Sequence, residues 1–510
     1  MRYTTIPVVG AVNHDLSAIR MHQINHPFTE HYKEDVFAVD PKSFCDGYPM
    51  GFAWFSPDCT HFSRARGGTP VKKEIRGLSW VIVKWALSVR PRIMVMENVP
   101  EIRTWGPLIE RNGKKYPDQN RSGETFDGFV KILTTGIEPD HPALLECCEF
   151  LNISINSSDA QRLISGLGYT MEWRELCAAD YGVHTTRTRF FGVFRCDGKP
   201  IVWPKQTHGK RGTKDVENGT LEAWKPAYEI LDFNIIAPSI FATKEEIKQK
   251  YSVRAVRPLK DNTLRRVARG LDKFILQSDE PFAVKLQQGQ AATVAPYLVQ
   301  YHTERSEHVR GQCVDEPIMT LDASNRYGVV CPILTKYYGN DEHGQDIRDP
   351  LHTVTAKDRE GVILVHTKQV ENLRPMRYLS DTMMVTSIGS IDKYGRWPCV
   401  REILNRWAGY TIKEDELLLK KICGEWYFIE DIGLRMLKTK EAYRAMGFAP
   451  DYVFNVDSDG QKITASKQME KCGNAVCPDI AGLIAASNLP EYARTTVCRS
   501  MEEWRKSVVA

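Results

Sequence analysis

The chain has 510 residues, of which 42% are hydrophobic and 26% are charged, and its formal net charge is +4. This length predicts two or more domains with a large core, and the composition is typical of a globular protein. No apolar run approaches the ~18 residues that a membrane span requires. The short run at residues 6–12 leads directly into polar residues, so we expect neither a membrane segment nor a signal peptide.

The thirteen cysteines do not have the spacing of a disulfide or zinc framework. There is no CxxC pair; Cys147 and Cys148 are adjacent, and Cys472 and Cys477 lie close together near the C-terminal end. We therefore expect reduced thiols in a cytosolic protein and no metal site.

The first two hundred residues alternate strand and helix patterns, which predicts an α/β fold with a parallel sheet. Strands are expected at residues 8–12, 51–56, 93–96, 171–177 and 190–194, and helices at 77–88 and 160–167. Residues 111–128 are polar and rich in glycine, which predicts a surface loop.

The composition changes near Pro204, and residues 205–214 predict an exposed linker. From there to about residue 430 the pattern is irregular, with one helix expected at 262–271. A strand–turn–strand pattern occurs twice, at 315–330 and again at 348–363, and two copies are too few for a solenoid. We therefore predict a locally duplicated β module. Further helices are expected at 438–448 and 479–487.

Chemically reactive side chains lie beside several of the expected strands, and their order along the chain indicates a function. Cys59 follows a strand through Ser56-Pro57-Asp58, and Glu97 ends a buried strand. Arg187 and Arg189 precede the last strand, and Gly473-Asn474-Ala475-Val476 lies near the C-terminal end. A thiol, a carboxyl group and two cations suit one reaction well. The thiolate adds to a ring carbon, the acid protonates a ring nitrogen, and the cations hold the base.

This set, in this order, resembles the DNA cytosine-5 methyltransferases, most closely the bacterial and phage forms with an SPDC-HFS nucleophile motif. The resemblance implies a Rossmann-like, S-adenosylmethionine-dependent methyltransferase domain plus a smaller, β-rich target-recognition domain. It implies a catalytic domain at 1–204, a recognition domain at 205–430, and a brace with a returning C-terminal helix at 431–510. It also implies double-stranded DNA as the partner, a restriction–modification setting and the cytoplasm of a bacterial or phage-infected cell.

The resemblance also assigns the catalytic residues. Cys59 is the nucleophile that attacks C6 of cytosine, and Glu97 contacts N3 and the exocyclic amine. One guanidinium of Arg187 and Arg189 reaches the carbonyl O2, and the other pairs locally or contacts phosphate. Two positions depart from the family pattern: Asp58 separates proline from cysteine, and Thr185 stands where glutamine is usual. Asn98 and Val99, which follow Glu97, are expected to be structural.

The cofactor residues follow from the same resemblance. Asn13 faces the ribose, His14 stacks on adenine, and Asp35 accepts from the adenine amine, although Asp35 also fits an ordinary turn aspartate. Pro57 is also assigned to cofactor binding. The turn with Asn474 and Ala475, where the family has serine, touches the methionine end of the cofactor.

The glycine-rich loop that should precede residue 8, of the form DLFxGxGG, does not occur. In our order of preference, it lies upstream, a separate polypeptide supplies it, or the protein is degenerate. We therefore expect residues 1–510 alone to bind S-adenosylmethionine poorly and to expose the strand edges at 8–12 and 51–56.

Three alternatives stay open at this point. The chain could be an inactive or split DNA-binding remnant, or an RNA cytosine methyltransferase, although the long insert between Arg189 and Arg435 favours DNA. A thiol hydrolase using Cys59 and His61 fits least, because a histidine two residues away cannot easily orient on that thiol. Basic residues scattered over 244–269 predict phosphate contacts, or else form a solvated helix face.

Overall fold

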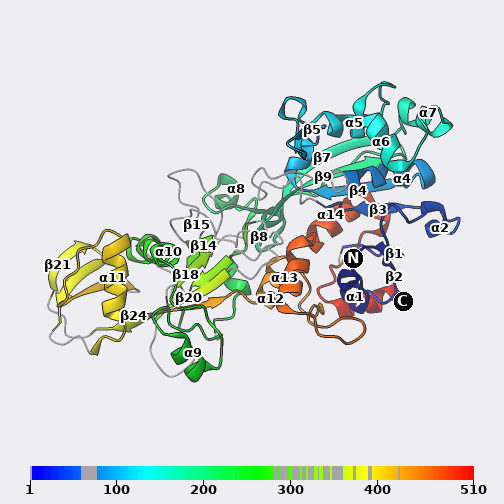
Figure 1. The fold of residues 1–510 in the computed structure, drawn as a ribbon. Helices are drawn as coiled ribbons and strands as arrows, with labels where there is room; N and C mark the ends of the chain where they lie inside the picture. The colour runs from blue at the N-terminus through cyan, green and yellow to red at the C-terminus, as the bar shows by residue number, and fades with distance from the viewer. Residues whose placement is uncertain are drawn as a thin grey trace.

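The fold is taken from a computed structural model of the chain. It describes residues 3–58, 77–233, 235–279, 284–285, 293–294, 297–300, 311–312, 318–319, 327–330, 332–336, 345–346, 360–370, 375–388, 393–422 and 425–509. Figure 1 shows an α/β unit at one end of the molecule and a β-rich unit at the other, with α12 and α13 between them.

A four-stranded sheet in the order β3-β4-β9-β7 forms the centre of the α/β unit. β3 (Phe52–Phe55) and β4 (Ile93–Asn98) run parallel, and β9 (Thr188–Arg195) and β7 (Thr170–Cys177) extend the sheet with antiparallel pairing. All six residues of β4 are buried, as expected for a strand that is covered on both faces. These four strands confirm those predicted from residue 51 onward.

Two hydrophobic cores cover the two faces of this sheet. Met94 and Met96 of β4 point into the first core, and Ile93 and Val95 point into the second, in the alternation of a strand. Helices contribute to the first core as follows: α4 (Trp80–Val89), α5 (Glu124–Leu133), α6 (Pro142–Leu151) and α7 (Ser158–Ser165). Helices near the C-terminal end cover the second face, so the α/β unit uses both ends of the chain.

A second, smaller sheet lies beside the first (Figure 1). β1 (Gly10–Val12) and β2 (Glu30–Tyr32) pair in parallel, and α1 (Leu16–Asn25) connects them. Among the described strands β1 pairs only with β2, and β3 pairs only with β4. The facing edges of β1 and β3 are therefore unpaired within the described residues.

Two expectations for this unit are wrong. Residues 111–128 are not a loop, because β5 (Leu108–Arg111) and β6 (Lys114–Pro117) form a hairpin and α5 follows. Asn112 and Gly113 take the positive φ values, 51° and 68°, that a two-residue hairpin turn requires. Residues 205–214 are not simply an exposed linker either, because β10 (His208–Gly209) is buried and pairs with β11 (Glu222–Ala223).

The β-rich unit contains a ten-stranded sheet, with β17 branching from β14 and the other strands in the order β15-β14-β19-β18-β20-β24-β23-β22-β21. Its strands are β14 (Tyr297–Gln300), β15 (Gly311–Gln312), β17 (Tyr327–Val330), β18 (Pro332–Lys336), β19 (Gln345–Asp346), β20 (Glu360–Gln369), β21 (Pro375–Ser380), β22 (Met383–Ser387), β23 (Glu416–Ile422) and β24 (Glu425–Met436). The expectation of a single helix here is wrong. The part of this unit that the structure describes contains three helices of eight or more residues: α9 (Lys244–Tyr251), α10 (Asp261–Leu271) and α11 (Trp397–Trp407).

The two strands of the first repeat copy pair with different partners. β16 (Ile318–Met319) lies parallel to β8 (Thr185–Thr186) of the α/β unit, whereas β17 pairs with β14. Most of the second copy, residues 348–359, lies outside the described residues. The duplicated module therefore stays a prediction, but backbone pairing does connect its first copy to the segment that carries Arg187.

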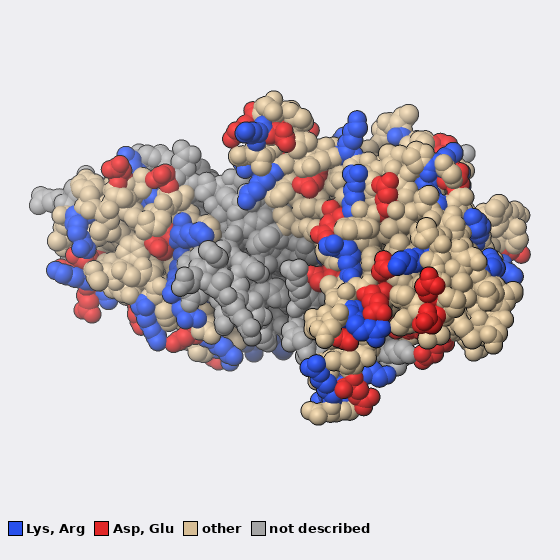
Figure 2. All heavy atoms as spheres, turned by 90° about the horizontal axis from the view of Figure 1, so that it is seen from above, with Lys and Arg blue, Asp and Glu red and all other residues tan. Residues whose placement is uncertain are grey.

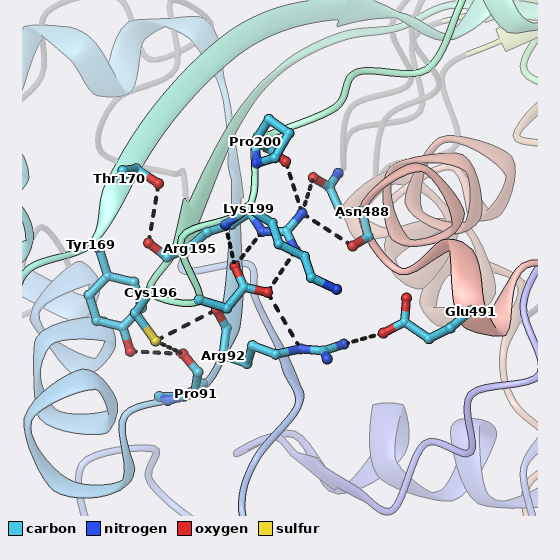
Figure 3. A network of polar contacts seen from close by, with 11 residues as sticks. Pro91, Arg92, Tyr169, Thr170, Arg195, Cys196, Lys199, Pro200, Asn488 and Glu491 are labelled. Carbon is cyan, nitrogen blue, oxygen red and sulfur yellow. Dashed lines mark hydrogen bonds and ion pairs between the residues drawn. The ribbon is translucent and has the colours of Figure 1, made fainter.

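The C-terminal helices are α12 (Thr439–Ala445), α13 (Ala465–Asn474), α14 (Pro478–Asn488) and α15 (Met501–Val509). The end of α14 is fastened to the sheet through Asn488, which is buried (Figure 3). Arg195 at the end of β9 donates to the backbone and side-chain oxygens of Asn488 at 3.3 and 3.5 Å, and it is paired with Asp197 at 2.8 Å. Arg92, just before β4, reaches Glu491 at 2.7 Å.

Candidate active site

The expected nucleophile, Cys59, follows β3 in the sequence. Cys59 itself lies outside the described residues, so its geometry is not stated. The approach to it is described: the Asn98 side chain donates to the Pro57 carbonyl at 3.0 Å, and Trp54 Nε1 donates to Ser56 Oγ at 3.0 Å. Asn98 thus holds the turn against the end of β4, which agrees with its expected structural role. The neighbouring Asp58 is exposed.

Glu97 and Arg189 meet as a buried ion pair. Glu97 lies near the carboxyl end of β4 opposite Phe191, so Arg189 is its diagonal neighbour across the β4–β9 ladder. Arg189 Nε lies 3.4 Å from Glu97 Oε1, and each residue is only 7% exposed. The sheet therefore brings these two predicted residues together at one strand end. A buried carboxylate and guanidinium can hold the hydrogen-bonding edge of a planar base.

Arg187 points to a different partner. Its Nη1 donates to the Gly473 carbonyl at 3.1 Å, in the last turn of α13, and its own backbone N–H donates to Thr185 Oγ1 at 3.2 Å. Arg187 is buried. The two arginines are therefore divided between the acid of β4 and the turn that carries Asn474. Which of the two guanidinium groups reaches the carbonyl O2 of cytosine stays a prediction.

The predicted cofactor residues lie at the ends of these elements. Asn13 and His14 are exposed directly after β1, and the Asn13 side-chain oxygen accepts from the Asp15 N–H at 2.8 Å. Asp35 is exposed, and its Oδ1 accepts from the Phe37 N–H at 2.9 Å, which is the turn contact of the alternative interpretation. Asn474 is exposed at the end of α13, followed by the half-buried Ala475.

Sequence reasoning missed an ion pair that connects these segments. Asp15 caps the N-terminus of α1 by accepting from the Ser17 and Ala18 N–H groups, and it also pairs with Lys471 of α13. Partial burial alone would raise the pKa of Asp15, but Lys471 and the capping hydrogen bonds lower it below its usual value. The partners are 456 residues apart. The Asp15 cap was readable from the sequence, whereas the pairing was not.

Cys477 is a second residue that was missed near the site. Its thiol is buried at the N-cap of α14, and the charges of Arg187, Asp479, Arg189 and Glu97 all act on it. Burial raises its pKa to about 12, although the two arginines oppose this. A thiol that stays protonated is a poor nucleophile, so Cys477 is not a candidate for that role. The nine cysteines in the described ranges are all free of disulfides.

The basic residues at 244–269 do not form one phosphate-binding row. Arg257 and Arg266 are buried, and Arg257 donates to the Ser239 and Pro238 carbonyls, so neither residue is available to DNA. Figure 2 shows acidic and basic side chains interleaved over the described surface of one face. Within the described ranges, no helix is long and apolar enough to cross a membrane, and no cluster of three metal-binding side chains occurs.

Known proteins are similar to the N-terminal part of the chain. A family described as "C-5 cytosine-specific DNA methylase" matches residues 1–106. The type II methyltransferase M.SacI of Streptomyces achromogenes is 39% identical over 93 residues, a match that spans 18% of this chain and 23% of that protein. The family match over residues 1–106 includes Asn13, Cys59 and Glu97.

Solved structures align with most of the chain at low similarity. The S. pombe Dnmt2 methyltransferase is 13% identical, with a TM-score of 0.37 over 95% of this chain and 91% of that one. The Entamoeba histolytica methyltransferase EhMeth is 10% identical, with a TM-score of 0.35 over 94% of this chain and 89% of that one. Scores below 0.5 establish no shared fold by themselves. The strand pairing described above shows the α/β and β-rich architecture, and residues 1–106 are similar to the C-5 cytosine-specific DNA methylase family.

Proposed function

We propose that the protein transfers a methyl group from S-adenosylmethionine to C5 of cytosine in double-stranded DNA. The observation that supports this most directly is the buried Glu97–Arg189 pair, which lies at the same edge of the sheet as the turn leading to Cys59. The target base is flipped out of the duplex to reach these groups, which lie near the β8–β16 contact between the two units.

The protein side chains then act on the cytosine ring in turn. The Cys59 thiolate adds to C6, and Glu97, protonated at this step, donates to N3 so that C5 becomes nucleophilic. Arg189 stabilises the developing charge at O2. After C5 is methylated, loss of its proton and elimination of the thiolate restore the aromatic ring. Arg187 contributes by holding the Gly473 turn.

S-adenosylmethionine supplies the electrophilic methyl group when it is bound. Polar groups suited to its ribose and amino-acid ends, Asn13 and Asn474, are exposed at the ends of β1 and α13, and His14 is free to stack on its base. Asn13 offers its amide N–H groups, because its oxygen already accepts from Asp15. The residues present thus fit the cofactor, but no acidic ribose acceptor stands at position 13.

We further propose that a glycine-rich strand–loop segment, either upstream of residue 1 or on a separate polypeptide, completes the cofactor site. The unpaired edges of β1 and β3 support this, because the parallel strands of an α/β sheet are normally paired and buried. β3 is only half-buried, whereas its neighbour β4 is fully buried. The same observation favours a second candidate function, one part of a split enzyme. Either form would act where the DNA lies, in the cytoplasm of a bacterial or phage-infected cell, and serve restriction–modification.

Covalent capture tests the proposed reaction. Duplex DNA in which 5-fluorocytosine replaces cytosine should form a denaturation-resistant adduct when S-adenosylmethionine is present at millimolar concentration, because fluorine cannot leave C5 as a proton does. Cys59→Ser should form no adduct. The control Cys399→Ser, which changes a half-buried thiol on α11, should form as much as the wild type. An adduct that persists in Cys59→Ser would rule out the nucleophile, and no adduct in any variant would favour the split or inactive form.

A further inference from the structure

The last turn of α13 is held from two sides by distant parts of the chain. On one side, Arg187 of the β8–β9 segment donates to the Gly473 carbonyl. On the other side, the Lys471 ammonium pairs with Asp15 at the start of α1 and with Glu470 at 3.0 Å. Asn474 and Ala475 follow directly in the sequence. The turn that we propose to contact the methionine end of the cofactor is therefore anchored by two contacts, one at Gly473 and one at Lys471.

The ion pair between Lys471 and Asp15 does more than the general attraction between a lysine and the C-terminal end of a helix. A lysine in the last turn of any helix gains from the helix dipole, but such a side chain can remain in solvent. The Lys471 side chain is only 12% exposed, so its ammonium has left most of its water and needs a counter-charge. Asp15 supplies that charge while its other oxygen caps α1. The position of α13 is thereby tied to the helix that begins just after Asn13 and His14.

We propose that Lys471 is a positioning residue for cofactor binding. Through Asp15 it holds the Asn474–Ala475 turn in register with Asn13 and His14, the pair at the other end of the proposed ligand. The inference rests on the proposed function, since it takes S-adenosylmethionine as that ligand. It predicts that the pair contributes to cofactor affinity and little to DNA binding, because neither residue faces the Glu97–Arg189 pair.

Three variants separate this role from general stability. Lys471→Met removes the charge but keeps an apolar stem of similar length, whereas Lys471→Arg keeps the charge. Lys467→Met is the matched control, because Lys467 lies one turn earlier on α13 and is exposed. Equilibrium dialysis with labelled S-adenosylmethionine should give a Kd roughly tenfold higher for Lys471→Met. Lys471→Arg and Lys467→Met should stay within about twofold of the wild type.

A double variant tests the partner. Asp15→Asn keeps the N-cap, because asparagine caps helices as well as aspartate does, but it removes the counter-charge. It should weaken cofactor binding as Lys471→Met does, and the double variant should be no worse than either single one. Equal Kd values for the wild type and Lys471→Met, or fully additive losses, would overturn the inference.

Amide hydrogen exchange provides a readout that needs no cofactor. Lys471→Met should speed exchange across 473–476 at least several-fold and leave β4 and β9 unchanged, because only the turn has lost an anchor. If the wild type bound no S-adenosylmethionine at millimolar concentration even with the glycine-rich segment added, the proposed function would be wrong. The proposal that Lys471 positions the Asn474–Ala475 turn would then be tested by amide hydrogen exchange alone. Unchanged exchange rates at 473–476 would reject it.

Discussion

Glu97 shows how burial and pairing turn a common residue into a candidate acid. Its carboxylate and the Arg189 guanidinium have both left water, so each compensates the charge of the other. Removing one partner from such a buried pair is costly, because the remaining charge is left uncompensated. A variant at this position therefore has to be judged for stability as well as for turnover.

We expect Glu97→Gln to reduce single-turnover methylation by roughly a hundredfold or more, because the amide cannot donate a proton to N3. DNA affinity should change little. The thermal midpoint should be measured alongside, with Glu110→Gln on the exposed end of β5 as the control. Normal turnover in a folded Glu97→Gln protein would contradict the acid role, and a variant that does not fold would assign Glu97 to structure.

The sequence predicts candidate site residues, but it does not predict most of the partners that these residues have in the structure. Glu97 stood out because an acid follows a run of buried strand residues, and its pairing with Arg189 follows from two adjacent strands. The separate role of Arg187 could not be predicted, since it depends on a carbonyl 286 residues away. Lys471 was missed for the same reason: nothing near it in the chain indicates that its partner is Asp15.

Elements rich in apolar residues were predictable, and elements built mainly from polar residues were missed. β4 follows from its apolar run, and α14 from the apolar residues of 479–487. The β5–β6 hairpin was missed although Asn112-Gly113 is a strong turn signal, because the flanking residues are polar. α9 was missed despite its capping box of Thr243 and Glu246, because it is mostly charged.

The unpaired edges of β1 and β3 lead to a prediction at this scale. Residues 1–510 alone should bind S-adenosylmethionine at least ~100-fold more weakly than the completed protein, because two lost hydrogen bonds to a charged group cost about 3 kcal/mol or more. The exposed edges should also promote aggregation. A strand followed by a glycine-rich loop, fused ahead of residue 1 or added as a peptide, should restore both properties. Calorimetry and light scattering measure them.

Micromolar cofactor binding and full methylation by residues 1–510 without any addition would overturn this prediction. A matched control is the same added segment with the loop glycines replaced by alanine, which should restore solubility but not cofactor binding.

At the scale of the whole molecule, residues near the two ends of the chain lie side by side and form hydrogen bonds. The Thr5 N–H donates to the Tyr492 carbonyl at 2.8 Å, and Arg494 donates back to Tyr3. His26 at the end of α1 packs edge-on against Trp504 of α15 at 4.8 Å. His22 stacks on His26 and hydrogen-bonds His31 at 2.7 Å, so three imidazoles share this junction.

Because of the histidines at this junction, the folded protein becomes less stable as the pH falls. Burial, together with the smaller effect of neighbouring imidazoles, lowers the pKa of His22 to about 4 and that of His26 to about 2. The folded protein therefore keeps both rings neutral, whereas the unfolded chain takes up protons below pH ~6.5. Stability is fully present above that pH and is lost as the pH falls toward 4, by about 1.4 kcal/mol per pH unit for each ring.

Denaturant unfolding at pH 7.5, 6.0 and 5.0 measures this slope. In the His26→Gln variant the replaced side chain cannot titrate, so the change in unfolding free energy with pH should be about half as large. An identical slope in the variant and the wild type would show that the junction does not contribute.

The fastening of α14 to β9 has a consequence for how the protein is made. Arg195 and Asn488 are 293 residues apart, and nearly the whole β-rich unit is translated between them. At roughly 5–20 residues per second, a ribosome needs ~15–60 s to reach Asn488 after Arg195 has emerged. During that interval the C-terminal helices that cover one face of the first sheet have not yet been synthesised. The nascent chain is therefore a natural client for chaperones that shield apolar surface, and its α/β unit can complete its folding only when synthesis is nearly over.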